Sequence, residues 1–319
     1  MIIAFDFSIL TRPYRLQRCI YQMVHLATIA ERMGHTVKAI VNDHVTAANA
    51  SLSTIKHLWT YDYGDMDIYF AKADAYYRDL NWEHVSKLKA FKVCGCNSDK
   101  CFRESDKPWQ EHLGTPVQTR CDLYMPVNHT AKLIQEYGHK VLPVAHPIDP
   151  RMANMFRKRG LYDAYLDDDV VKLRNHFKQE ETGVACFMGN IRPKRGVVEE
   201  IIKYADFSWK RAASPTDYIN WMMKYRGCLD IRGNGDKSLR FTESAMLGRT
   251  IICVRLPSGY YPPLINGKNC FIADTWQELA DLQYEKSEWL KISEEATENY
   301  INGWSLRSQV KAFIDKSGI

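Results

Sequence analysis

The chain opens with a strand–helix–strand pattern, and this limits the folds open to it more than any other feature. Ile2–Phe7 is apolar enough for a buried strand, and Leu16–Met33 repeats apolar side chains at helical spacing. Gly34 then predicts a helix end in the left-handed conformation, and Thr36–Val41 predicts a second strand. Such a unit is typical of a parallel sheet with helices on both faces.

The same alternation continues along the chain and predicts two domains. Further strands are expected in the first half at Ile68–Ala71, Ala90–Cys96, Cys121–Met125 and Val141–Ala145, with a helix at Thr130–Tyr137. Strands are expected in the second half at Val184–Gly189, Cys228–Ile231, Thr250–Arg255 and Asn269–Ile272. Helices between and after them are expected at Val197–Tyr204, Ser214–Lys224, Ser238–Leu247, Thr275–Tyr284 and Trp304–Phe313. We therefore expect an α/β protein with two Rossmann-like domains, residues 1–146 and 147–303, whose ligands bind at the carboxyl ends of the strands.

Composition excludes several other classes of protein. The chain is 45% hydrophobic and 25% charged, as soluble globular proteins are, and no apolar run approaches the roughly 18 residues of a membrane span. Its N-terminus predicts a first strand rather than a signal peptide. Nine scattered cysteines then indicate reduced thiols and a cytoplasmic location, which would be the host cytoplasm for a viral protein. The net charge of +5 permits a polyanionic partner without requiring one.

A glycine-rich segment in the second half is the strongest candidate for binding a ligand. It connects an expected strand to an expected helix, and glycines let backbone N–H groups approach an anion there. The residues expected at this anion site are Arg232, Gly233, Gly235, Ser238 and Arg240. Glu243 lies about a turn further along the helix, within reach of ribose hydroxyls. A plain turn with solvated side chains is the alternative.

A second segment of the same kind lies earlier in the same domain. Phe187–Gly196 leaves an expected strand and carries the cations Arg192, Lys194 and Arg195. Guanidinium forks match phosphate oxygens well. A solvated basic loop is the alternative, but two such loops at strand ends favour a ligand that contains phosphate.

Several segments resemble those of GT-B glycosyltransferases, a family with two Rossmann-like domains. The similar segments occur in the family's order: Gly34–Val37 (G-H-x-V), Leu142–Asp149 (I-P-N-G-V-D), Phe187–Gly196 (F-V-G-R-x-x-x-x-K-G) and Glu243–Ile252 (E-A-M-A-x-G-x-P-V-V). The spacing of Ser238, Arg240, Glu243 and Gly248 is closer to the exostosin-like branch. The resemblance implies an N-terminal acceptor domain and a C-terminal nucleotide-sugar domain facing across a cleft. It also implies a last helix, within 304–319, that returns toward the first domain.

The resemblance implies roles for individual residues as well. Glu243 would bind the ribose of the donor, Arg195 stands in place of a diphosphate-binding lysine, and Arg240 is a further diphosphate ligand. The implied donor is a UDP- or GDP-sugar, with no strict need for a metal.

Two positions depart from the family pattern. Asn190 replaces the first phosphate-binding arginine, so Arg192 is expected to substitute for it. Gly235 stands where many retaining members carry a glutamate, which leaves the stereochemistry of transfer open.

An inverting transferase needs an acidic residue or a histidine near the acceptor hydroxyl, to act as general base. The candidates at expected strand ends are Asp6, His44, Asp62 and Asp74, of which we favour Asp74 and Asp6 as catalytic residues. The loop Ser8–Arg15 follows the first strand, and its side chains Arg12, Tyr14 and Arg15 are expected to meet the acceptor or the donor phosphate.

Three questions stay open at the level of sequence. Cys94, Cys96 and Cys101 permit a zinc site, but alternating cysteines also fit one face of a buried strand, so no metal is expected. The acceptor is either a glycan or, for a viral or phage enzyme, a hydroxymethylated base in double-stranded DNA; no membrane partner is expected. A sugar-nucleotide epimerase of the same fold and a non-catalytic nucleotide-binding protein are the alternative functions.

Overall fold

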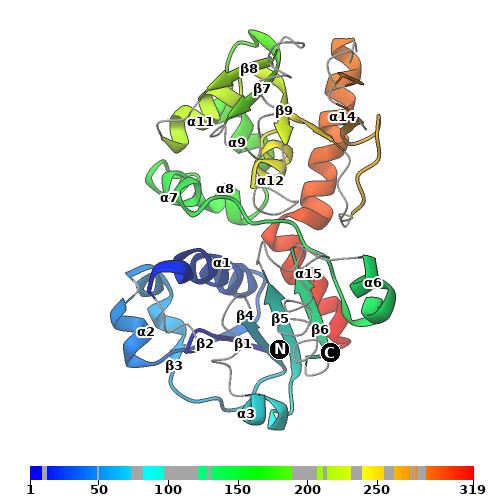
Figure 1. Ribbon diagram of the computed structural model, residues 1–319. Helices are drawn as coiled ribbons and strands as arrows, with labels where there is room; N and C mark the ends of the chain where they lie inside the picture. Colours follow the sequence, from blue (N-terminus) through cyan, green and yellow to red (C-terminus); the bar gives the residue numbers. More distant parts are fainter. Residues whose placement is uncertain are drawn as a thin grey trace. The chain divides into compact units, whose positions relative to one another are not determined.

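A computed structural model describes most of the chain. The described residues are 1–8, 13–48, 50–72, 82–96, 121–127, 131–188, 207–210, 214–230, 239–254, 262–273, 275, 277–278 and 285–319. The chain divides into two compact units: unit 1 is Met1–Val144 with Leu306–Ile319, and unit 2 is Ala145–Ser305. Both chain termini therefore belong to unit 1, where Figure 1 marks them. The boundaries expected from the sequence, after residues 146 and 303, lie two residues from the observed ones, after residues 144 and 305.

Unit 1 contains a six-stranded, fully parallel sheet. Its strands are β1 (Ile2–Asp6), β2 (Thr36–Ile40), β3 (Trp59–Thr60), β4 (Ile68–Lys72), β5 (Phe91–Cys96) and β6 (Leu123–Pro126). Their order is β3-β2-β1-β4-β5-β6, with parallel register between all neighbours. This is the strand order of dinucleotide-binding Rossmann folds, in which the order reverses between β1 and β4 and ligands bind at the carboxyl ends beside that point.

The helices of unit 1 cover this sheet. They are α1 (Pro13–Arg32), α2 (Asp43–Ala48), α3 (Trp82–Lys87), α6 (Ala131–Tyr137), α15 (Leu306–Ser317) and the 3-10 helices η1 (Ala50–Leu58) and η3 (Gly138–Lys140). The end of α1 confirms the expected glycine cap: Gly34 has a φ of 88°, and the N–H of His35 donates to the carbonyl of Ala30. Phe313 of α15 packs on Phe5 and Phe70, with ring centroids 6.5 and 5.6 Å away, so the last helix completes the core of this unit.

Unit 2 contains a second parallel sheet. Its strands are β7 (Gly183–Met188), β8 (Phe207–Lys210), β9 (Tyr225–Asp230), β10 (Thr250–Val254) and β11 (Phe271–Ala273), in the order β11-β10-β9-β7-β8. All neighbouring strands are parallel. Read from β8, this is the second common order of doubly wound sheets, and its reversal lies between β7 and β9. The segment with Arg192, Lys194 and Arg195 follows β7 in the sequence, and the glycine-rich segment with Arg232 and Arg240 follows β9; we call these the two cation-rich segments.

The helices of unit 2 are α7 (Pro150–Lys158), α8 (Tyr162–Leu166), α9 (Val170–Phe177), α11 (Pro215–Met222), α12 (Leu239–Met246), α14 (Lys286–Asn299) and the π-helical turn η5 (Tyr300–Trp304). Helix α12 ends as α1 does: Gly248 has a φ of 68°, and the N–H of Arg249 donates to the carbonyl of Ser244. Trp289 of α14 packs edge-to-face on Phe271 of β11, with ring centroids 4.7 Å apart. The contact between Trp289 and Phe271 holds α14 against the sheet.

One expected strand is wrong, and others were missed. The expected strand Val141–Ala145 forms only an isolated parallel bridge between Val141 and Tyr124. Leu142 and Val144 donate to carbonyls of β6, but Pro126 of β6 has no N–H with which to bond back to Leu142. Among the described elements, α2, η1, β3, α3, η3, β8, α14 and most of η5 match no segment named from the sequence, whereas α7, α8 and α9 fall almost entirely in Met152–Glu181, a stretch whose sequence is charged and helical in character. The helix expected at Val197–Tyr204 and most of the one at Thr275–Tyr284 lie outside the described residues.

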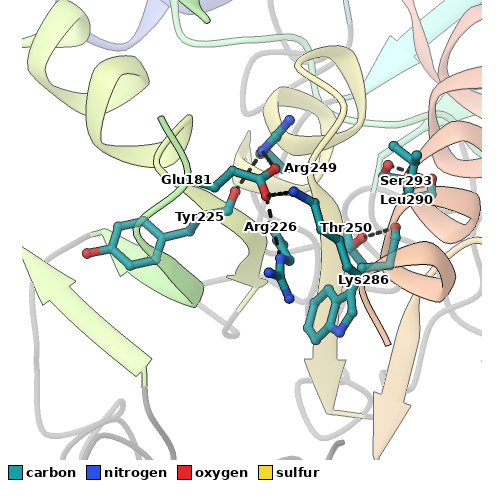
Figure 2. A network of polar contacts seen from close by, with 9 residues as sticks. Glu181, Tyr225, Arg226, Arg249, Thr250, Lys286, Leu290 and Ser293 are labelled. Carbon is teal, nitrogen blue, oxygen red and sulfur yellow. Dashed lines mark hydrogen bonds and ion pairs between the residues drawn. The ribbon is translucent and has the colours of Figure 1, made fainter. Parts of the chain in front are cut away.

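A charged network ties the amino ends of the strands of unit 2 together (Figure 2). Glu181, just before β7, lies 3.5 Å from Arg226, 3.4 Å from Arg249 and 3.4 Å from Lys286. Burial alone would raise the pKa of Glu181. Arg249, Lys286 and the hydrogen bonds together lower it by more than burial raises it, so the pKa lies below its ordinary value. Arg249 also donates to the carbonyl of Tyr225 at 2.9 Å, so the network joins β9 and β10 at their amino ends.

Candidate functional site

The strands β7 and β9, after which the two cation-rich segments follow in the sequence, are parallel neighbours and end at the same edge of the sheet of unit 2. Arg240 lies in the first turn of α12, and its guanidinium carbon is 4.8 Å from the ring centroid of Phe187 in β7. A guanidinium over an aromatic face is held by the ring quadrupole and by its own planar shape. This contact places the start of α12 beside β7, the strand that precedes Arg192, Lys194 and Arg195 in the sequence.

Glu243 follows Arg240 on α12 and is buried, with 3% of its surface exposed. Its Oε1 accepts a hydrogen bond from the backbone N–H of Asp149 at 3.1 Å, and its carboxylate also interacts with the Tyr218 hydroxyl. Burial raises the pKa of Glu243, the contacts with Tyr218, the Asp149 N–H and Arg240 lower it, and the net direction is upward. The carboxylate is thus buried among a few directed partners, beside the cationic start of its helix.

Helix α12 also fixes the segment that begins unit 2. The hydroxyl of Thr242 donates to the carbonyl of His146 at 2.7 Å, next to the Glu243 contact with Asp149. Asp149 in turn caps α7, since its carboxylate accepts from the backbone N–H of Arg151 at 2.8 Å. The segment His146–Pro150, whose two prolines are typical of a linker, is therefore held to the candidate ligand-binding helix at two points.

Several expected ligand-binding residues lie outside the described residues, and their roles stay predictions. These are Arg192, Lys194, Arg195, Arg232, Gly233, Gly235 and Ser238 in unit 2, and Arg12 and Asp74 in unit 1. Tyr14 and Arg15 fall in the first turn of α1, where the structure describes the backbone. The structure adds Tyr218, Thr242 and Asp149 as neighbours of Glu243; Asp149 ends the family-like segment Leu142–Asp149, whereas Tyr218 and Thr242 were not singled out in the sequence.

Unit 1 carries a separate polar network at the carboxyl end of β1. Asp6 is fully buried, and its Oδ1 accepts from the backbone N–H of Ser8 at 2.9 Å and from the Ser8 hydroxyl at 2.5 Å. Its Oδ2 accepts from the hydroxyls of Tyr63 at 2.9 Å and Tyr69 at 2.6 Å. A carboxylate has about four lone-pair positions, so these four donors fill it. Such an arrangement suits a residue that positions its neighbours better than one that takes a proton from a substrate.

The remaining candidate residues of unit 1 have simpler surroundings. His44 and Asp62 have exposed side chains, and Asp62 accepts from the backbone N–H of Gly64 at 3.2 Å. Cys94 is buried in an apolar cluster with Cys121, Tyr124 and Val141. Within the described residues no group of three His, Cys, Asp or Glu side chains could hold a metal ion; Cys101 lies outside them. None of the described helices is long and apolar enough to span a membrane.

Comparisons with known proteins agree on the fold. No protein-family model matches the chain, and no curated protein matches it. The crystal structure of a glycosyltransferase from Rickettsia africae ESF-5 is similar over 99% of this chain and 97% of that chain, with a TM-score of 0.54 and 12% identity. A protein described as a UDP-N-acetylglucosamine 2-epimerase from Listeria monocytogenes is similar over 98% of this chain and 95% of that one, with a TM-score of 0.50 and 10% identity.

These likenesses, together with the two parallel sheets, confirm the expected α/β class with Rossmann-like domains of the GT-B type. At such low identity they establish the fold, and the reaction has to be argued from the residues.

Proposed function

We propose that the protein is a glycosyltransferase that binds a nucleotide-sugar donor through unit 2. The observation that carries this proposal is the pairing of Arg240, stacked on Phe187 of β7, with the buried Glu243 on the same helix. Both lie at the point of the sheet where doubly wound folds bind nucleotides. A cation for phosphate and a carboxylate for ribose hydroxyls on one helix match the two polar parts of a nucleoside diphosphate.

The proposed roles follow from the chemistry of each group. The contacts of Glu243 with the Asp149 N–H and the Tyr218 hydroxyl use two of about four acceptor positions, which leaves others for ribose hydroxyls. Arg240 binds the diphosphate together with the cations predicted in the two cation-rich segments. The donor is a UDP- or GDP-sugar, and the binding groups proposed here are all protein groups, without a metal.

For unit 1 we propose the acceptor-binding role. Asp74 remains the proposed general base, whereas we assign Asp6 a positioning role because its four acceptor positions are filled. We propose a glycan as the acceptor. We also propose that the protein belongs to the exostosin-like branch and that it is of viral origin. Modified duplex DNA is the other acceptor to test; binding to it that persists at about 0.2 M salt would support DNA, and no binding at low salt would exclude it.

The second candidate is a sugar-nucleotide epimerase, favoured by the likeness in fold to the Listeria protein described as one. It would convert the donor's sugar without any acceptor. A non-catalytic nucleotide-binding protein would bind the same ligands without turnover.

A donor panel separates these three functions. The purified protein is incubated with UDP-, GDP-, ADP- and CMP-sugars, with and without a mixture of mono- and disaccharides. Products are read by mass spectrometry and by NMR of the anomeric protons. Release of the nucleotide (UDP, GDP or ADP, or CMP from a CMP-sugar) together with a new glycoside supports a transferase. A new sugar nucleotide without acceptor supports an epimerase. Saturable binding without product supports a binding protein, and absence of both binding and turnover contradicts all three.

A further inference from the structure

Three side-chain hydroxyl groups direct their protons toward the carboxylate of Asp6. The Ser8 hydroxyl donates to Oδ1 at 2.5 Å, and the hydroxyls of Tyr63 and Tyr69 donate to Oδ2 at 2.9 and 2.6 Å. A serine or tyrosine hydroxyl has a single proton, and each of these protons is used on the carboxylate. Asp6 therefore orients three hydroxyl groups at once.

This orientation leaves the oxygens of Ser8 and Tyr63 as a pair of hydrogen-bond acceptors. The two oxygens lie 3.3 Å apart, and neither has a second proton to give the other. Both side chains are partly exposed, whereas Asp6 and Tyr69 beneath them are buried. Burial, and then the charge of Asp6, raises the pKa of Tyr63 to about 12, so its hydroxyl keeps the proton that it gives to Asp6 at neutral pH.

The pair sits where a doubly wound sheet binds its ligands. Ser8 follows β1, Asn42 follows β2 and Tyr63 follows β3, so all three lie at the carboxyl edge of adjacent strands. The Asn42 amide donates to the carbonyl of Ser8 at 2.8 Å, while its own carbonyl accepts from the N–H of Val45 at 2.9 Å. The backbone of Ser8 is therefore held from two strands, and its hydroxyl has a fixed position.

We propose that the Ser8–Tyr63 pair binds a hydroxyl group of the acceptor sugar, with Asp6 as the positioning residue beneath it. Two acceptor oxygens side by side require a ligand that donates hydrogen bonds, as a sugar hydroxyl does. The rings of Tyr63 and the exposed His84 pack edge-to-face, with centroids 4.4 Å apart, and add an apolar surface beside the pair. A sugar offers hydroxyls next to C–H faces and matches both parts. This inference rests on the proposed glycosyltransferase function.

The test compares acceptor and donor kinetics in four variants. Ser8→Ala and Tyr63→Phe each remove one acceptor oxygen, Ser8→Thr keeps the hydroxyl, and Tyr61→Phe removes an exposed hydroxyl of the same loop as a matched control. Initial rates are measured for the donor that the panel identifies and for each mono- or disaccharide that accepts its sugar. The loss of one neutral hydrogen bond predicts that Ser8→Ala and Tyr63→Phe each raise the acceptor KM roughly 3- to 10-fold. The donor KM stays at its wild-type value, and Ser8→Thr and Tyr61→Phe keep the wild-type acceptor KM.

The outcomes separate this inference from the function on which it rests. If the wild-type protein turns over no donor, the proposed function is wrong and this inference falls with it. If it transfers sugar but Ser8→Ala and Tyr63→Phe leave the acceptor KM unchanged, the inference alone is wrong. Equal increases in donor and acceptor KM would also overturn it, because they would indicate a general structural effect. If Ser8→Thr raised the acceptor KM as much as Ser8→Ala does, that result would also indicate a structural effect and overturn the inference.

Discussion

Replacing Glu243 by glutamine tests the assignment of the donor site most directly. The variant keeps the shape of the side chain and removes its charge. The glutamine carbonyl can still accept from the N–H of Asp149, which Glu243 binds at 3.1 Å, and its amide can donate to the Tyr218 hydroxyl beside it. We therefore expect Glu243→Gln to fold. Glu243→Ala would instead leave the Asp149 N–H without this acceptor, at a cost of about 1–3 kcal/mol.

The size of the functional effect follows from the charge. A hydrogen bond to a charged group contributes about 1.5–3 kcal/mol, against about 0.5–1.5 kcal/mol for a neutral pair. If ribose hydroxyls donate to Glu243, the neutral amide should weaken nucleotide binding by about 1–2 kcal/mol. This corresponds to roughly a 5- to 30-fold increase in Kd.

The assay is isothermal titration of UDP and GDP into wild type and variant, with thermal unfolding as a check on folding. Glu181→Gln is the matched control, because it makes the same chemical change in the same unit, within the charged network at the amino ends of the strands that Figure 2 shows. We expect the control to bind nucleotide as wild type does. If Glu243→Gln binds both nucleotides with wild-type affinity, then Glu243 serves only to hold Asp149 and the ribose assignment is wrong.

Two further predictions concern stability. Glu243 has a raised pKa and Glu181 a lowered one, against an ordinary value of 4.5, so their pH effects should differ in sign. In urea unfolding, wild type should lose stability relative to Glu243→Gln as pH rises from 4.5 through the raised pKa. The extra free energy of unfolding of wild type over Glu181→Gln should be present above pH 4.5 and disappear as pH falls through the lowered pKa of Glu181. If both differences in unfolding free energy changed with pH in the same sense, the two pKa directions would be wrong. Phe313→Ala should cost about 3–5 kcal/mol of unfolding free energy, because Phe313 is fully buried against Phe5 and Phe70. The exposed Lys316→Ala on the same helix is its control, and a loss below about 1 kcal/mol for Phe313→Ala would show that α15 is not part of this core.

Much of the fold could be predicted because parallel strands are buried on both faces and appear as short apolar runs. β1, β4 and β10 were found in this way. Helix α14 was missed although a signal existed: Trp289, Ile292 and Ala296 recur at helical spacing and are buried. The capping box that starts it uses Glu285 where serine or threonine is usual, so its N-terminus did not stand out.

The candidate sites were less accessible to sequence reasoning, since their partners come from distant segments. Asp6 could be singled out as an acidic residue at a strand end. Its donors Tyr63 and Tyr69 are 57 and 63 positions away, and no local pattern links them to it. Similarly, Glu243 was found through a motif, whereas its contact with Asp149, 94 positions earlier, depends on how α12 packs against the start of unit 2. Periodicity reveals which face of an element is buried, but a polar contact between distant elements is decided by tertiary packing.

The return of α15 to unit 1 has a consequence for how the protein is made. Ribosomal synthesis runs from the N-terminus, and domains generally fold as they emerge. Here the first 144 residues emerge without Phe313 and the rest of α15, while Ala145–Ser305 emerges as one continuous stretch. The apolar surface that α15 covers therefore stays uncovered on the nascent chain until unit 2 has been translated. Unit 2 is able to reach its native state first, although it is second in the sequence.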